Sequence, residues 1–207
     1  MTPLSRRAFV TTAAAALLVG CGGHPAAPPG GTPATAGPGG ASTAVRPAAK
    51  PARALGRSVP VRLRIPAIGV DTPLIRLGLA PDGSVQVPPI AAHDRAGWYR
   101  NSPTPGQKGP SVILGHVTVG SYGDGVFRHL ARLRHGDRIV VRLENGRSAE
   151  FAVSAVRTVA KADFPADAVY GDVDRPELRL ITCGGPRSGS GYRDNVIVFA
   201  ALSSASP

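Results

Sequence analysis

The order of apolar and polar residues along the chain predicts a β-rich domain between Val59 and Leu202. Alternating apolar and polar residues are typical of a half-buried strand, and a short unbroken apolar run is typical of a strand buried on both faces. Both patterns occur here between glycine, proline, Asp-Gly and Asn-Gly turn signals. The expected strands are residues 61–65, 72–77, 85–87, 111–117, 138–143, 149–157, 178–183 and 195–202. About eight short strands predict a mainly β fold, a closed or nearly closed β-barrel, because closure removes unpaired sheet edges.

Little helix is expected between these strands. Residues 126–133 can form a short helical turn, and residues 162–169 can form another within a longer loop. Residues 91–109 are expected to be irregular, with Trp98 filling the core nearby, and residues 184–191 are expected to be a loop. The Asn145-Gly146 pair predicts a tight hairpin between two of the strands.

The first 21 residues have the features of an export signal. Arg6 and Arg7 precede an apolar run over residues 13–19, which is too short to span a bilayer but suits a signal peptide. The paired arginines resemble a twin-arginine signal. The motif Leu18-Val-Gly-Cys21 resembles a lipobox, so Cys21 is the expected lipidation site and the protein is expected to be an extracytoplasmic, membrane-anchored lipoprotein. An ordinary secretory signal with an incidental Cys21 is the alternative.

Residues 22–58 are rich in proline, glycine and alanine and have no hydrophobic period. Such a segment cannot bury a core, so a disordered linker is expected before a folded domain over residues 59–203. The net charge is +11, but the basic residues of the domain are scattered and are not interleaved with aromatic residues. This pattern argues against specific nucleic-acid binding and leaves weak attraction to an anionic wall or membrane surface as the simpler reading.

Three residues of the predicted barrel can carry out acyl-transfer chemistry. Cys183 ends one expected strand before two glycines, His116 ends another, and Arg193 directly precedes the last. A thiolate can attack a peptide carbonyl to form a thioester, and a histidine can move the protons. An arginine can donate hydrogen bonds to the oxyanion. Taken singly, each residue could instead be a buried small side chain, a core histidine or a solvated loop residue; their shared position at strand ends favours a catalytic site.

The residues around this site resemble the sortases, the cysteine transpeptidases of Gram-positive cell walls. The family signature Thr-Leu-x-Thr-Cys is matched by Arg179-Leu-Ile-Thr-Cys183 in all but its first residue. The motifs Ile65-Pro-Ala-Ile-Gly-Val70, Ala96-Gly-Trp-Tyr99, Leu114-Gly-His-Val117, Ile181-Thr-Cys-Gly-Gly185 and Tyr192-Arg-Asp-Asn-Val196 are similar to the actinobacterial class F group.

This resemblance implies an eight-stranded sortase barrel with His116, Cys183 and Arg193 as catalytic residues and with no cofactor. It implies cleavage of an LPxTG-like signal on surface proteins and transfer of the acyl group to a cell-wall amine. Thr118 departs from the acidic residue that is frequent in the group. Asn195, two residues after Arg193, shares its face if the last strand starts early, which leaves the oxyanion partner open.

Other functions remain as alternatives to a sortase. Another cell-wall cysteine peptidase or hydrolase would also use a cysteine and a histidine, although the order here, His116 before Cys183, differs from that of papain-like enzymes. A surface binding module could keep the barrel without catalysis. No metal site is expected, because the chain has no closely spaced cysteine or histidine pair of the kind that binds zinc, and no acidic cluster suggests calcium.

Overall fold

The structure is a computed structural model that describes residues 53–189 and 191–206. The expected signal peptide, Cys21 and most of the expected linker lie outside the described residues. None of the helices within the described part of the chain is both long and apolar enough to cross a membrane.

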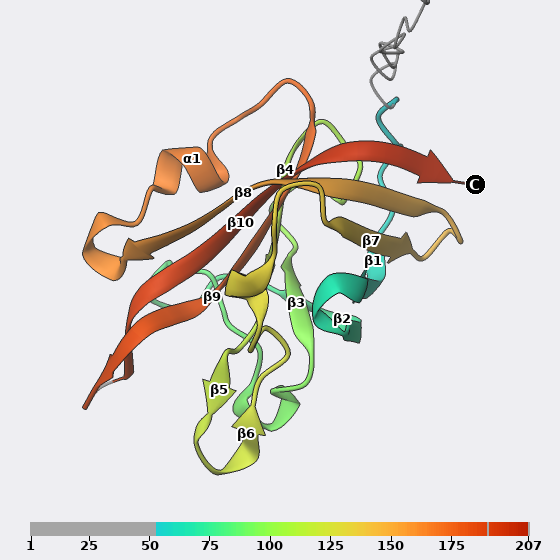
Figure 1. Cartoon of the computed structure of the whole chain (residues 1–207). Coiled ribbons are helices and arrows are strands. Elements are labelled where there is room, and N and C mark those ends of the chain that lie inside the picture. Colours follow the sequence, from blue (N-terminus) through green and yellow to red (C-terminus); the bar gives the residue numbers. More distant parts are fainter. Residues whose placement is uncertain (1–52, 190, 207) are drawn as a thin grey trace, which may run out of the picture. The chain divides into compact units, whose positions relative to one another are not determined.

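Eight strands close into a barrel in the order β1-β2-β3-β4-β9-β10-β8-β7 (Figure 1). Their bounds are β1 (Pro60–Ile65), β2 (Val70–Leu77), β3 (Ala96–Tyr99), β4 (Gly109–Leu114), β7 (Arg138–Leu143), β8 (Ser148–Ala160), β9 (Pro176–Ser188) and β10 (Gly191–Ser206). Two pairs, β2–β3 and β4–β9, are parallel, and the other neighbouring pairs are antiparallel. The mainly β fold and the closed eight-stranded barrel predicted from the sequence are therefore confirmed.

The remaining elements are short. They are the 3₁₀ turns η1 (Pro66–Ile68), η2 (Ile90–Ala92), η3 (Gly120–Tyr122), η4 (Leu130–Arg132) and η5 (Lys161–Asp163), the helix α1 (Ala166–Tyr170), and the strands β5 (Thr118–Val119) and β6 (Gly123–Asp124). The helical turns expected near 126–133 and 162–169 correspond to η4 and to η5 with α1. The small β5–β6 hairpin projects from the barrel just after His116 (Figure 1).

One expected strand was wrong, and another strand was missed. Residues 85–87 make only an isolated bridge, between Leu79 and Val85, because the two prolines that follow have no N–H to continue a ladder. Strand β3 takes the place in the barrel that residues 85–87 were expected to fill, and it lies within a segment that was expected to be irregular. Its Gly97 looks like a loop residue in the sequence, but a Cβ at this position would lie 2.4 Å from the Leu77 side chain. Glycine is therefore needed for β3 to pack closely beside β2, and the next residue, Trp98, is buried as expected.

The strand that carries Cys183 does not end there, which corrects the sequence-based expectation. Strand β9 continues to Ser188, and Gly184 pairs with Asp194 on β10. The register shifts between Tyr192 and Asp194, and Gly185 has a φ of 71°. Because glycine adopts this left-handed conformation at little cost, the Gly-Gly pair supports a bulged hairpin where a loop was expected.

Apolar side chains form two clusters, one inside the barrel and one on its outer surface. The interior cluster includes Phe151, Trp98, Leu178 and Leu180, and the outer cluster consists of Val112, Val169, Ile181 and Ile197. Alternate residues of β9 therefore face opposite sides of the sheet. Leu55 also packs into the interior cluster, so the folded domain includes residues that were assigned to the linker.

A buried ion pair holds α1 against the outer face of the sheet. The Arg179 guanidinium donates hydrogen bonds to the Glu177 carboxylate and to the backbone carbonyl of Ala168 in α1. It also lies 4.6 Å from the centre of the Phe199 ring. Arg179 is 3% exposed and Glu177 is 8% exposed, so removal of the Glu177 carboxylate would leave the Arg179 charge buried without its counter-ion.

The Glu177 carboxylate should make the stability of the protein depend on pH. Burial alone would raise the pKa of Glu177, but hydrogen bonds from Arg179 and Arg175 outweigh it and hold the pKa below that of a free glutamate. Its contribution is therefore complete above the pKa of the unfolded chain and is lost as the pH falls through the lower folded value. We expect Glu177→Gln to lower the free energy of unfolding at pH 7 by about 2–4 kcal/mol.

The same substitution should weaken the loss of stability between about pH 5 and pH 3, measured by denaturant unfolding across that range. Glu150→Gln is the matched control, because Glu150 also pairs with an arginine, Arg138, but at a more exposed position. This control should change stability by less than about 1 kcal/mol. Equal effects of the two substitutions would contradict a special role for the buried pair.

Candidate active site

The Cys183 thiol lies on the outer face of the barrel. Leu178 and Leu180 of β9 point into the interior cluster and Ile181 belongs to the outer cluster, so Cys183 shares the outer face with Ile181. The thiol is free and its residue is only half-buried. It is therefore not sealed in the core and can meet a peptide that lies along this face.

His116 reaches the same place from the neighbouring parallel strand. Strands β4 and β9 pair in parallel up to Leu114 and Ile181, and the Gly115 N–H donates to the Ile181 carbonyl. His116 and Cys183 each lie two residues beyond that last pair. Because the carboxyl ends of parallel strands meet at one edge, the structure brings the imidazole and the thiol to the same end of the barrel.

A backbone carbonyl orients the His116 ring. The His116 Nε2 atom lies 2.7 Å from the carbonyl oxygen of Pro88. Because a carbonyl oxygen can only accept a hydrogen bond, Nε2 is the protonated nitrogen of the neutral ring and Nδ1 is left to accept a proton. No residue that orients His116 could be identified from the sequence, because every residue has a backbone carbonyl and the residue type does not show which one is used.

Arg193 lies on β10, inside the strand, where it was expected to precede it. It occupies the bulge between Tyr192 and Asp194, is exposed, and lines a cavity of about 360 Å³ together with Lys161 and Pro186. The Tyr192 hydroxyl is 2.8 Å from the Thr118 hydroxyl, so a hydrogen bond ties this part of β10 to the chain that directly follows His116. Arg193 therefore sits on the strand next to that of Cys183, at the same end of the barrel.

Asn195 is the residue directly opposite Cys183. The two are register partners in the antiparallel β9–β10 pair, and Ile197, two residues further along, belongs to the outer cluster. The Asn195 side chain therefore points to the same face as the thiol. The sequence predicted that Asn195 shares a face with Arg193 if the last strand begins early. Strand β10 does begin at Gly191, but the register shift between Tyr192 and Asp194 interrupts the regular alternation at Arg193.

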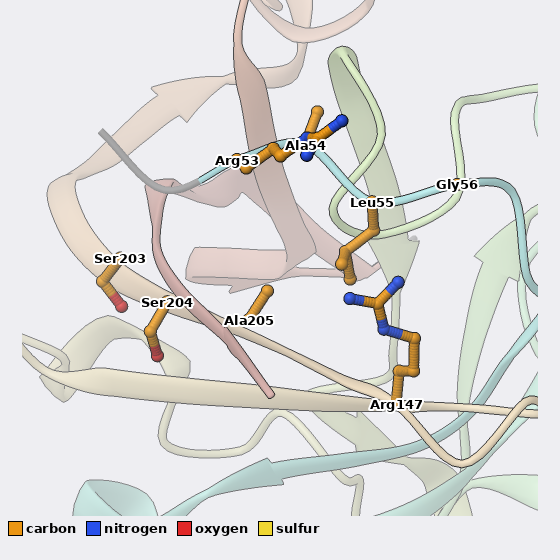
Figure 2. Close-up of a pocket in the computed structure, with 8 residues that line it drawn as sticks. All are labelled: Arg53, Ala54, Leu55, Gly56, Arg147, Ser203, Ser204 and Ala205. Carbon is orange, nitrogen blue, oxygen red and sulfur yellow. The ribbon is translucent and has the colours of Figure 1, made fainter. Parts of the chain in front are cut away.

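A second cavity lies at the opposite end of β10. Figure 2 shows this space of about 550 Å³, lined by Arg53–Gly56 of the incoming chain, by Arg147, and by Ser203–Ala205. Ser203 is eight residues from Asn195 along an extended strand, which corresponds to about 26 Å. The cavity is therefore separate from the Cys183 region. Within residues 53–189 and 191–206, no group of three or more His, Cys, Asp or Glu side chains is placed to hold a metal ion.

The arrangement has the parts that acyl transfer needs. A half-buried thiol and an oriented histidine each lie two residues beyond the last β4–β9 pair, and an arginine and an asparagine lie on the adjoining strand. Such a set can activate a sulfur nucleophile, stabilise a developing negative charge and protonate a leaving amine.

Comparison with known proteins gives a consistent family. The Sortase domain family matches residues 63–203. Among solved structures, the SrtA sortase from Actinomyces oris is 25% identical with a TM-score of 0.54, over 78% of this chain and 89% of that chain. Sortase C-1 from the same organism is 20% identical with a TM-score of 0.53, over 69% of this chain and 72% of that chain.

Sortase A from Corynebacterium diphtheriae is 21% identical with a TM-score of 0.53, over 71% of this chain and 61% of that chain. No curated protein matches the sequence. The family match covers more than half of the chain, and the solved relatives have the same fold. The chain therefore belongs to the sortase family.

Proposed function

We propose that this sortase is a class F transpeptidase that cleaves an LPxTG-like sorting signal through a Cys183 thioester and transfers the acyl group to a cell-wall amine. The observation that supports the proposal is that His116 and Cys183 each lie two residues beyond the last β4–β9 pair, at the same end of the barrel. Both residues are only half-buried, so a bound peptide can contact them. The alternative of an inert barrel gives no reason for a half-buried free thiol at the same end of the barrel as an oriented imidazole.

The reaction begins with the transfer of the thiol proton to His116. Nδ1 accepts this proton while Nε2 keeps its hydrogen bond to Pro88. The thiolate then attacks the carbonyl carbon of the residue before the scissile bond, and the oxygen becomes an oxyanion. The Arg193 guanidinium donates hydrogen bonds to that oxyanion or to the adjoining substrate backbone. Collapse of the tetrahedral intermediate breaks the C–N bond, and His116 gives its proton to the departing amine.

The second half-reaction runs in the opposite direction. An incoming amine attacks the thioester carbonyl and gives a proton to His116, and the C–S bond then breaks with the thiolate as leaving group. A new amide joins the acyl group to the acceptor, and the Cys183 thiolate takes the proton from His116, which returns the enzyme to its starting state. Water can replace the amine as a slow nucleophile, which gives hydrolysis of the sorting signal.

An apolar cavity supports the proposed substrate. A space of about 410 Å³ on the outer side of β4 is lined by Val112, Tyr99 and Tyr170, among other residues. Val112 pairs with Arg179, four residues before Cys183, which corresponds to about 13 Å along β9. An extended peptide bound at Cys183 would place a residue three or four positions upstream near this cavity, and an LPxTG-like signal has its leucine three residues before the threonine.

The proposal for class F and for location rests on sequence motifs. The motifs that begin at Ile65, Ala96 and Tyr192 favour class F. Lipidation of Cys21 would anchor the domain at the outer surface of the membrane, facing the wall. The anchor does not enter the chemistry, so the soluble domain should be active on its own.

Removal of the nucleophile should abolish turnover. We expect Cys183→Ala to show no cleavage of an LPxTG-type peptide, because Cys183 is the only cysteine within residues 53–189 and 191–206 that could form the thioester. The wild-type protein mixed with peptide should gain the mass of the acyl fragment on the Cys183 peptide, measured by mass spectrometry after acid quenching. Ser188→Ala, an exposed change on the same strand, should keep wild-type activity. Cleavage by Cys183→Ala would overturn the mechanism.

Arg193 should affect the chemical step and leave the fold intact. We expect Arg193→Gln to lower kcat by about 10²–10³ with a small change in KM, as for the loss of an oxyanion donor. Arg193→Lys should recover only part of the rate, because an ammonium cannot present a planar pair of donors. Thermal unfolding of both variants should match the wild type, since Arg193 is exposed. Arg142→Gln, an exposed change on β7, is the control, and a similar loss of kcat in it would count against a specific role for Arg193.

The cavity of about 410 Å³ should determine how strongly the enzyme prefers leucine at the first position of the LPxTG-like signal. Tyr170 is 39% exposed and lines the cavity, so Tyr170→Ala should remove apolar contact without loss of the core. The ratio of kcat/KM for a peptide with leucine to one with alanine at that position should fall by about tenfold. Tyr122→Ala is the control, because Tyr122 is also exposed but does not line this cavity. An unchanged ratio in Tyr170→Ala would show that the leucine binds elsewhere.

A further inference from the structure

The environment of the Asn195 side chain is unusual for a strand residue. Asn195 is followed by the apolar residues 196–198, and asparagine is disfavoured in strands. Local disagreement between a residue and its element is typical of a functional position. Its partner on β9 is Cys183 and its partner on β8 is Val159. Neither of these side chains has an oxygen that could accept a hydrogen bond, so neither partner uses the donors of the Asn195 amide.

The register places this amide within reach of the reacting carbonyl. Directly opposed residues of an antiparallel pair have Cβ atoms about 4.5–5.5 Å apart, and both side chains here point to the outer face. When the thiolate has attacked, the carbonyl oxygen is bonded to the same carbon as the sulfur. A donor one strand away can therefore approach the oxyanion at about 2.7–3.1 Å, the distance at which such donors act.

We infer that Asn195 is a further catalytic residue, whose side-chain amide donates a hydrogen bond to the carbonyl oxygen that becomes the oxyanion during attack by Cys183. The inference rests on the proposed function and deepens it. Arg193 lies at a bulge and is exposed, whereas Asn195 lies in the regular part of β10 and is half-buried. The asparagine is thus the more rigidly placed of the two donors, and rigid placement is what makes a donor effective at the transition state.

The test compares acylation of Cys183 by substrate with alkylation of the same thiol by iodoacetamide. Alkylation forms no oxyanion, so it reports the reactivity of the thiol alone. Asn195→Leu, close in size and without a donor, should slow thioester formation by about 10²-fold with KM changed by less than about twofold. Its rate of alkylation should stay within about twofold of wild type. Asn195→Ala should behave in the same way, and it replaces Asn195→Leu in the test if the leucine variant does not fold.

Two further variants sharpen the result. Asn195→Asp should slow acylation more than Asn195→Leu, because a carboxylate repels the oxyanion, and it should also slow alkylation because a negative charge raises the pKa of a nearby thiol. Asn195→Gln keeps a donor on a longer side chain and should recover part of the acylation rate. Thr158→Ala is the control, an exposed change on the neighbouring strand β8, and should acylate as the wild type does.

The outcomes separate this inference from the proposed function. Wild-type acylation rates in Asn195→Leu and Asn195→Ala, with a working wild-type enzyme, would overturn only the role of Asn195. Equal losses of acylation and alkylation in these variants would also overturn it, because they would show an effect on the thiol and not on the oxyanion. A wild-type protein that cleaves its peptide without any thioester on Cys183 would overturn both.

Discussion

The parallel pairing of β4 with β9 is the constraint on which the proposed active site depends. Parallel strands cannot be joined by a tight turn, so β4 and β9 are joined by a long connection that itself includes β7 and β8 of the barrel. The histidine and the cysteine each lie two residues beyond the last β4–β9 pair, at the same end of the barrel. Catalytic geometry is therefore a property of the complete fold, and local unfolding of either strand would separate the two groups.

The two faces of β9 have different roles, because one packs the core and the other carries the proposed site. Leu178 and Leu180 fill the barrel, while the outer face carries Glu177, Arg179 and then Cys183. The buried ion pair at the start of this outer row fixes α1 over the sheet, and Tyr170 of that helix lines the apolar cavity. A charged pair that contributes little net stability in many proteins here sets the position of a wall of the proposed substrate groove.

Much of the fold and part of the site could be predicted from the sequence because the signals were local. Apolar alternation and the Asn145-Gly146 turn gave most strands, and Cys183 and His116 stand out by residue type and position. Strand β3 was missed because its small residues read as a loop, and only packing of Gly97 against Leu77 explains them. The bulge beside Arg193 and the Pro88 carbonyl were missed because register and backbone acceptors are set by distant parts of the chain.

The bulge in β10 affects how Arg193 and Asn195 lie relative to each other at the proposed site. Without the bulge, regular alternation would make the Arg193 and Asn195 side chains point to the same face. They would then be separated by the fixed spacing of two residues along the strand. The bulge leaves Asn195 paired with Cys183 and allows the preceding residues a separate course. Tyr192 then reaches the Thr118 hydroxyl, 74 residues away in sequence, and links β10 to the segment that follows His116. In this chain the hydroxyl groups of Tyr192 and Thr118 connect the two sides of the proposed site.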